Sequence, residues 1–163
     1  MLEAELRAEL YDSFKNRAMI YWLIYDELRQ EVGPERAENV LSRAIYRRGM
    51  ERGREKYRKY GPRDLKGLKE AFLGGIADDG KMFSPEIVRD DAEGLDIKFH
   101  ACPLRDAWLE AGLKPEDVAA LCRIASRVDY GTFEGAGFRF TADTWTPGDE
   151  GCCYLHIRQG AGA

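Results

Sequence analysis

The spacing of apolar residues changes near residue 80, and this change constrains the fold more than any other feature of the sequence. Before it, apolar residues recur at steps of three and four, which places them on one face of a helix. The first such series is Leu6, Leu10, Phe14, Ala18, Trp22, Tyr25 and Leu28. Gly33-Pro34 and Gly61-Pro62 interrupt the pattern, because glycine suits a helix exit and proline a first turn. We therefore predict helices over residues 2–30, 34–60 and 64–76.

The second predicted helix carries two glycines, Gly49 and Gly53, on the side that we expect to be buried. A glycine inside a helix costs about 1 kcal/mol relative to alanine. Because these two lie four residues apart, they would allow another backbone to approach the same helix face closely. The glycines therefore indicate either close packing or access for a ligand.

After residue 80, short segments with alternating polarity predict strands over 83–90, 95–100, 137–145 and 152–158, with helices over 103–110 and 115–128. Turn residues between the strands favour hairpins. The predicted fold class is α+β, with a helical N-terminal half packed on a small, mainly antiparallel sheet with inserted helices. We expect a single domain over 1–163, with a helical portion at 1–80, a strand-helix-strand portion at 81–159 and a disordered tail at 160–163.

Charge and hydropathy argue against several classes of protein. The 25 basic and 29 acidic residues are mostly interspersed and give a formal charge of -4, so we predict no nucleic-acid partner. The first residues alternate charges with leucines, unlike a secretory signal, and no apolar run has the length of a membrane span. We therefore predict a cytoplasmic protein with no membrane partner and with reduced thiols, although the adjacent Cys152 and Cys153 leave regulatory oxidation open.

Cys102 is the thiol whose position favours chemistry most, because Pro103 after it predicts that Cys102 caps a helix. The N–H groups and positive dipole end of a helix stabilise a thiolate and lower its pKa. Cys102 is therefore a candidate nucleophile, with a half-buried junction residue as the structural alternative. Cys122 lies with Val118 and Ala125 on the predicted buried side of its helix, where a free cysteine commonly fills the core.

The last predicted strand contains two more cysteines and a histidine. Cys152 and Cys153 are successive, so in a regular strand they point to opposite faces and only one of them faces a given pocket. His156 would share a face with Cys152 and Tyr154 unless a bulge intervenes. Histidine suits acid–base catalysis near neutral pH, but a strand histidine is also common at a sheet edge or surface.

Further polar and aromatic residues suit a small carboxylated substrate. Asp129 follows the helix predicted over 115–128, where a carboxylate orients a histidine, activates water or simply caps the helix. Arg105 and Arg139 lie near the cysteine segments and could bind a carboxylate in a bidentate manner, or lie on the surface. Trp22 suits either a pocket wall or the core. The cysteines and histidines lack the short ligand spacings of zinc sites, so we predict no metal and no cofactor.

Taken together, the C-terminal half carries a series of motifs. They are Phe99-His100-Ala101-Cys102-Pro103, then Leu121-Cys122 followed by Asp129, then Phe138 to Thr146, then Gly148-Asp149-Glu150-Gly151-Cys152-Cys153-Tyr154-Leu155-His156. Over about residues 95–158 this pattern resembles the L-2-amino-thiazoline-4-carboxylic acid hydrolase family. The residues with counterparts in that family are Cys102, Cys122, Cys153 and Asp129. The chain departs from the family pattern at Tyr154 and at Thr144-Trp145-Thr146, which bears on the substrate more than on the fold.

The resemblance implies a hydrolase that opens a cyclic amidine-like ring, such as that of an aminothiazoline carboxylate, and releases an N-carbamoyl amino acid. On this hypothesis the catalytic candidates are Cys102, Cys153, Asp129 and His156, and the substrate-binding candidates are Cys122, Arg139, Arg105 and Trp22. Cys102 would act as nucleophile or polarising group, while Asp129 and His156 would transfer protons.

Two other classes of function compete with a hydrolase. The main alternative is a non-enzymatic domain that binds a small molecule or senses redox state through its cysteines. A metal-binding thiol protein is a third hypothesis. The expected partner of the hydrolase is a small-molecule substrate, and the helical half also offers a surface for a homodimer.

Overall fold

The computed structural model describes residues 2–161 and has an α+β fold with a helical N-terminal half, as predicted. That half contains α1 (Leu2–Val32), α2 (Pro34–Lys56), a 3-10 turn (Arg58–Tyr60) and α3 (Leu65–Gly74). The second half contains β1 (Pro85–Asp90), β2 (Gly94–Phe99), α4 (Pro103–Glu110), α5 (Pro115–Gly135), β3 (Arg139–Asp143) and β4 (Tyr154–Arg158). None of these helices combines the length and the apolar character that crossing a bilayer would require.

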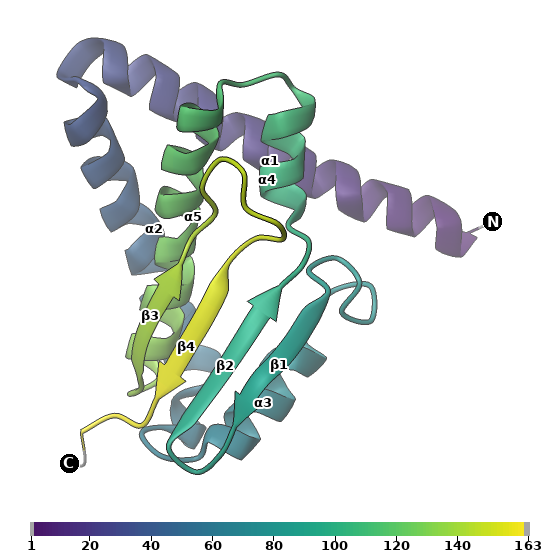
Figure 1. The fold of residues 1–163 in the computed structure, drawn as a ribbon, viewed down its shortest axis with the longest axis vertical. Helices are drawn as coiled ribbons and strands as arrows, with labels where there is room; N and C mark the ends of the chain where they lie inside the picture. The colour runs from purple at the N-terminus through teal and green to yellow at the C-terminus, as the bar shows by residue number, and fades with distance from the viewer. Residues whose placement is uncertain (1, 162–163) are drawn as a thin grey trace.

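The four strands form one antiparallel sheet in the order β1-β2-β4-β3, with α3 and α5 against its inner face (Figure 1). The alternation of side chains along β2 and β4 explains this arrangement. The apolar members of the two strands point inward and are buried: Leu95, Ile97, Phe99, Leu155 and Ile157. Their polar neighbours, including Asp96 and His156, therefore lie on the outer face, which the helices leave uncovered.

Close contact between α2 and α5 explains the glycines of α2. A Cβ atom at Gly49 would overlap the carbonyl oxygen of Val128, and one at Gly53 would overlap that of Thr132. The glycines of α5 are matched to this contact, since a Cβ at Gly131 would overlap the carbonyl oxygen of Tyr46. The prediction of close backbone packing is thus confirmed, and the partner is α5.

The same contact corrects the predicted end of α5. The helix continues from Val128 to Gly135 instead of stopping, because Gly131 serves the packing against α2 and not a turn. Asp129 therefore lies inside the helix and does not follow it. Its side chain is held at a defined position on the helix surface.

A bulge next to β4 is the second difference from the predicted strands. Phe99 accepts a hydrogen bond from the backbone N–H of Cys152 (2.8 Å) and donates one to the carbonyl of Cys153 (2.9 Å). Two residues thus oppose one, which breaks the regular alternation of side chains. For this reason β4 begins at Tyr154 and both cysteines precede it.

We predicted that residues 160–163 form a disordered tail, and the structure describes only residues 160 and 161 of this segment. Residues 162 and 163 lie outside the described residues. Gly160 is anchored, because its N–H donates a 2.9 Å hydrogen bond to the carbonyl of Pro62.

Candidate functional site

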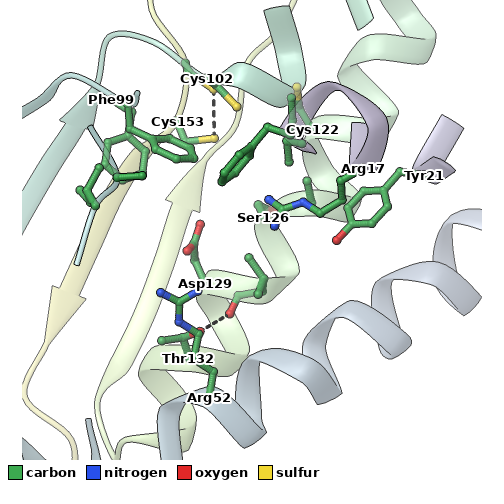
Figure 2. Close-up of a pocket in the computed structure, with 18 of the residues that line it drawn as sticks. Arg17, Tyr21, Arg52, Phe99, Cys102, Cys122, Ser126, Asp129, Thr132 and Cys153 are labelled. Atoms are coloured by element: carbon green, nitrogen blue, oxygen red, sulfur yellow. Dashed lines mark hydrogen bonds between the residues drawn. The ribbon is translucent and has the colours of Figure 1, made fainter. Parts of the chain in front are cut away.

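A cavity of about 400 Å³ lies between the helices and the ends of β2 and β4 (Figure 2). Its wall has three chemically different parts. All four cysteines contribute a sulfur part. The aromatic part contains Phe14, Phe72, Phe83 and Phe99, and the polar part contains Arg17, Arg52, Ser126 and Asp129. These residues come from segments far apart in the sequence, so the cavity forms only when the helices pack on the sheet.

The sulfur part brings together cysteines that the motifs single out. Cys102, Cys122, Cys152 and Cys153 are all free thiols, and the Sγ atoms of Cys152 and Cys153 are 3.5 Å apart. The prediction that only one of the adjacent cysteines faces a given pocket is wrong. The bulge opposite Phe99 turns both thiols toward the cavity.

The thiol of Cys102 does not have the lowered pKa expected at a helix start. Cys102 is the N-cap of α4, but its side chain makes no capping hydrogen bond. The neighbouring Cys152 thiol and burial raise the pKa of Cys102 well above its ordinary value, and the opposing effect of the Arg105 and Leu104 N–H groups is smaller. At neutral pH Cys102 is thus a protonated thiol that can donate a hydrogen bond.

Two further cysteines are also protonated, whereas the fourth is more accessible. Burial raises the pKa of Cys122 far above its ordinary value. Cys102 lowers the pKa of Cys152, but the Cys153 thiol and burial outweigh it and raise that pKa to about 12. Cys153 is half-buried, whereas the other three cysteines are buried. Cys153 is therefore the thiol that a ligand can reach most easily.

Asp129 faces the cavity from α5 with no partner of its own. Cys122, Ser126 and Asp129 are spaced by four and three residues, so they share the helix face that lines the cavity. Burial raises the pKa of Asp129 to about 7, although Arg52 and Arg17 lower it. Within residues 2–161, no hydrogen bond or ion pair reaches its carboxyl group. A carboxyl with a pKa near 7 can both accept and donate a proton at neutral pH.

Two arginines in the cavity were not among the predicted site residues. Arg17 enters from α1, with its guanidinium carbon 4.6 Å from the ring centre of Phe14, and Arg52 enters from α2 (Figure 2). In the part of the chain that the structure describes, neither guanidinium has a carboxylate or hydrogen-bond partner. Arg48 also lines the cavity, but it pairs with Glu51 at 3.1 Å.

The three predicted substrate-binding residues other than Cys122 do not line the cavity. The guanidinium of Arg105 pairs with Asp106 at 2.7 Å. Arg139 lies on β3 and donates a 2.9 Å hydrogen bond to the carbonyl of Gln159. Trp22 packs beside Tyr25 and under the Arg29 guanidinium, 5.0 Å from its ring centre. Arg139 and Trp22 are thus engaged elsewhere in the fold, whereas Arg105 is near enough to the cavity thiols for its charge to lower the pKa of Cys152.

His156 also lies apart from the thiols, on the outer face of the sheet. Its ring nitrogens contact Asp96 at 3.1 Å and Asp143 at 2.9 Å. Its ring packs against Tyr154 on the same face, as the strand alternation predicts, but the bulge separates both from Cys152. The role of His156 in proton transfer therefore has no support from its position.

The described residues offer no arrangement for a metal ion: among residues 2–161, no three His, Cys, Asp or Glu side chains are grouped suitably. The cavity is lined instead by thiols, aromatic rings and arginines.

Comparison with known proteins gives one family and one fold. Residues 13–157 match the family described as L-2-amino-thiazoline-4-carboxylic acid hydrolase. The crystal structure of a trafficking protein particle complex subunit 3 from Naegleria fowleri, covalently bound to palmitic acid, is similar with a TM-score of 0.59 at 18% sequence identity. The match covers 91% of this chain and 96% of that chain, and at this identity it shows the fold alone. No curated protein matches the chain.

Proposed function

The chain belongs to the L-2-amino-thiazoline-4-carboxylic acid hydrolase family, and from this premise we propose that it opens a small cyclic amidine-like ring by hydrolysis. The observation that carries the proposal is the position of Asp129, whose carboxyl lies in the same cavity as four thiols and has no partner among the described residues. Burial raises its pKa to about 7. Such a group can move protons in both directions during a hydrolysis near neutral pH.

In the proposed first step, the Cys153 thiol attacks the ring carbon that lies between nitrogen and sulfur. Asp129 accepts the thiol proton as Sγ of Cys153 bonds to that carbon and the C=N electron pair moves to nitrogen. The ring carbon–sulfur bond then breaks, and the departing sulfur takes the proton from Asp129. The product of this step is an isothiourea linked to Cys153, with the ring opened.

In the second step, water replaces the cysteine. Asp129 accepts one proton from water as the oxygen adds to the same carbon and the C=N electron pair moves to nitrogen. The remaining hydroxyl proton moves to that nitrogen as the C=O bond forms and the carbon–sulfur bond to Cys153 breaks. The Cys153 sulfur takes the proton held by Asp129, and an N-carbamoyl amino acid leaves with one water added overall. Cys102 and Cys152, as protonated thiols, serve as hydrogen-bond donors along this path.

The assignment of the nucleophile moves from Cys102 to Cys153 for a physical reason. Cys102 is buried and its pKa is raised well above the ordinary value, so its thiolate is scarce at neutral pH. Cys153 is half-buried and faces the same cavity. Exposure to the ligand favours Cys153 as the group that forms the covalent bond.

The test is turnover of L-2-amino-thiazoline-4-carboxylate, followed by mass spectrometry of substrate, product and protein. We expect the gain of one water in the wild type, its loss in Cys153→Ala, and a partial decrease in Cys102→Ala. Asp143→Asn, which changes an exposed carboxylate on the outer face of the sheet, is the matched control. Full turnover by Cys153→Ala would overturn the covalent route.

A binding domain without catalysis is the second candidate, and the aromatic part of the cavity favours it. Four phenylalanines line the cavity. Three of the four thiols have raised pKa values and are therefore uncharged at neutral pH, which suits a binding pocket for an apolar ligand. The similar Naegleria subunit carries palmitic acid covalently. A ligand that binds tightly and is recovered unchanged would favour this candidate over the hydrolase.

A further inference from the structure

We infer that the substrate of this cavity is a carboxylate larger than aminothiazoline carboxylate, held at its acidic group by Arg17 and Arg52 and at an apolar arm by the aromatic wall. The inference rests on the proposed function for the reacting ring, but on different residues for the rest of the substrate. The substrate class is a carboxylated cyclic amidine with an aryl or alkyl substituent.

The cavity has a larger volume than 2-amino-thiazoline-4-carboxylate, the substrate after which the family is named. Its volume is about 400 Å³, and sites for drug-sized ligands span roughly 300–1,000 Å³. At the protein packing density of about 0.75, a five-membered ring with one amino and one carboxyl group fills roughly a third of that space. The remainder is available to a further part of the ligand.

The unpaired arginines indicate an anion in the ligand. Elsewhere in the fold, Arg29 and Arg123 each contact a carboxylate at 2.7 Å. Arg17, which is exposed, and Arg52, which is half-buried, line the cavity and have no such partner among the described residues, although a guanidinium carries five N–H donors. The ring of Phe14 supports Arg17 without using those donors. Both groups therefore remain free for a carboxylate, which a guanidinium binds through two parallel hydrogen bonds.

Asp129 does not neutralise these two cations. Arg52 and Arg17 lower the pKa of Asp129, but neither forms an ion pair or hydrogen bond with it among the described residues, and burial outweighs their effect. Near neutral pH the cavity thus holds two positive charges against one partly protonated carboxyl. This imbalance favours a ligand that brings its own negative charge.

The aromatic wall indicates the apolar arm. The rings of Phe14 and Phe83 are 6.2 Å apart between centres, and those of Phe83 and Phe99 are 5.1 Å apart. The wall therefore runs from Arg17, which lies over Phe14, to Phe99, which lies beside Cys153 (Figure 2). A substituent on the reacting ring would cover these rings and remove their apolar surface from water.

Direct binding tests the inference without requiring turnover. The probes for isothermal titration calorimetry are 3-phenylpropanoate, propanoate and 3-phenylpropan-1-ol. We expect 3-phenylpropanoate to bind at least about tenfold more tightly than either of the others, because each lacks one of the two recognised groups. Equal affinity for the acid and the alcohol, or for the aryl and the short acid, would overturn the inference.

Matched variants assign the two halves of the ligand. Arg52→Gln is expected to weaken the binding of 3-phenylpropanoate at least about tenfold, because one charge-assisted contact is lost. The affinity for 3-phenylpropan-1-ol should stay within about twofold of the wild-type value. Arg54 is an exposed arginine on the same helix, and Arg54→Gln should leave the affinities for both ligands within about twofold of the wild-type values. Phe83→Ala should remove the preference for the aryl acid, with Phe83→Leu as the substitute if the alanine variant does not fold. Loss of affinity in Arg54→Gln equal to that in Arg52→Gln would contradict the assignment.

Failure of the inference is distinguishable from failure of the proposed reaction. Turnover of unsubstituted aminothiazoline carboxylate with no gain from an aryl substituent would overturn the larger substrate and leave the reaction in place. Binding of the aryl carboxylate with no consumption of any cyclic amidine would overturn the reaction and leave the ligand class in place.

Discussion

The outer face of the sheet and the cavity behind it both carry charged groups, but Asp96 on the outer face is paired, whereas Asp129 in the cavity has no partner among the described residues. On the outer face, Asp96 accepts a 2.6 Å hydrogen bond from Arg158 and contacts His156 at 3.1 Å. In the cavity, Asp129 has no such partner among the described residues. Charges that neutralise each other inside the fold contribute to stability, whereas charges left unpaired in a cavity are available to a ligand.

The two aspartates show the difference through opposite changes in pKa. Burial raises the pKa of Asp96, but the hydrogen bonds from Arg158 and His156 outweigh it and the pKa is lowered. Burial raises the pKa of Asp129 to about 7, and the more distant arginines do not compensate. The comparison predicts that the outer network is structural and that the cavity is functional.

The largest expected effect is on catalysis by Asp129. Asp129→Asn should lower kcat/KM for ring opening by about a hundredfold or more, because the proton acceptor is lost. Asp143→Asn, which removes a carboxylate from the outer face of the sheet, should leave kcat/KM within about twofold of the wild-type value. Steady-state kinetics on the two purified variants measures both values of kcat/KM. Equal decreases in the two variants would contradict a catalytic role that is specific to Asp129.

The pH dependence of catalysis is expected to follow Asp129. If its ionised form is the base, kcat/KM rises by about tenfold per pH unit below the pKa and levels off above it, at a pH of about 7. Asp129→Asn should abolish this limb. A pH–rate profile of wild type and variant measures it, and an unchanged limb in the variant would assign the titration to another group.

Stability should change in opposite directions for the two aspartates. Because the folded-state pKa of Asp129 is raised above its unfolded value, stability falls as the pH rises from about 4 to about 7. Asp129→Asn should therefore stabilise the fold at pH 8 by about 1 kcal/mol, a reduced figure because the Asp129 residue is half-buried.

Asp96 has a lowered folded-state pKa, so its contribution is present above the unfolded pKa and is lost as the pH falls through the folded value. Asp96→Asn should cost about 1 kcal/mol of unfolding free energy at pH 8, because Arg158 loses its charged partner. Urea denaturation of both variants at pH 8 tests whether the free energy of unfolding rises in Asp129→Asn and falls in Asp96→Asn. Destabilisation by both substitutions would remove the distinction between the two sites.

The smallest expected effect is at His156. His156→Gln should cost about 0.5 kcal/mol of unfolding free energy and leave kcat/KM within about twofold, because the histidine contacts only the outer carboxylates. Kinetics and denaturation on the same preparation measure both quantities. A large loss of turnover with unchanged stability would return His156 to the catalytic residues.

Apolar spacing was sufficient to predict most elements of the fold, and the errors occur where tertiary contacts decide. The helix 103–110 has the predicted bounds, since Pro103 starts it and its apolar face is regular. The helix predicted to end at Val128 continues, because Gly131 packs on α2, and local sequence does not distinguish a packing glycine from a turn glycine. The bulge at Cys152 and Cys153 depends on pairing with Phe99, which lies 53 to 54 positions earlier in the chain.

The candidate site was predicted in part for the same reason. Cys102, Cys122, Cys153 and Asp129, which the motifs single out, all line the cavity. The catalytic roles of Cys102, Cys153 and Asp129 and the substrate-binding role of Cys122 stay predictions. Arg17 and Arg52 were missed because they reach the site from α1 and α2, far from the motifs. One signal existed: Arg52 precedes Gly53, whose close packing on α5 brings that part of α2 next to Asp129.

The most direct test of the proposed role of Asp129 is its titration by carbon-13 NMR, with Asp129→Asn to assign its carboxyl resonance. We expect a midpoint near pH 7 in the free protein. A midpoint near the ordinary value of 3.8 would mean that the carboxyl is either solvated or paired. That result would contradict the unpaired carboxyl from which the proposed hydrolysis follows.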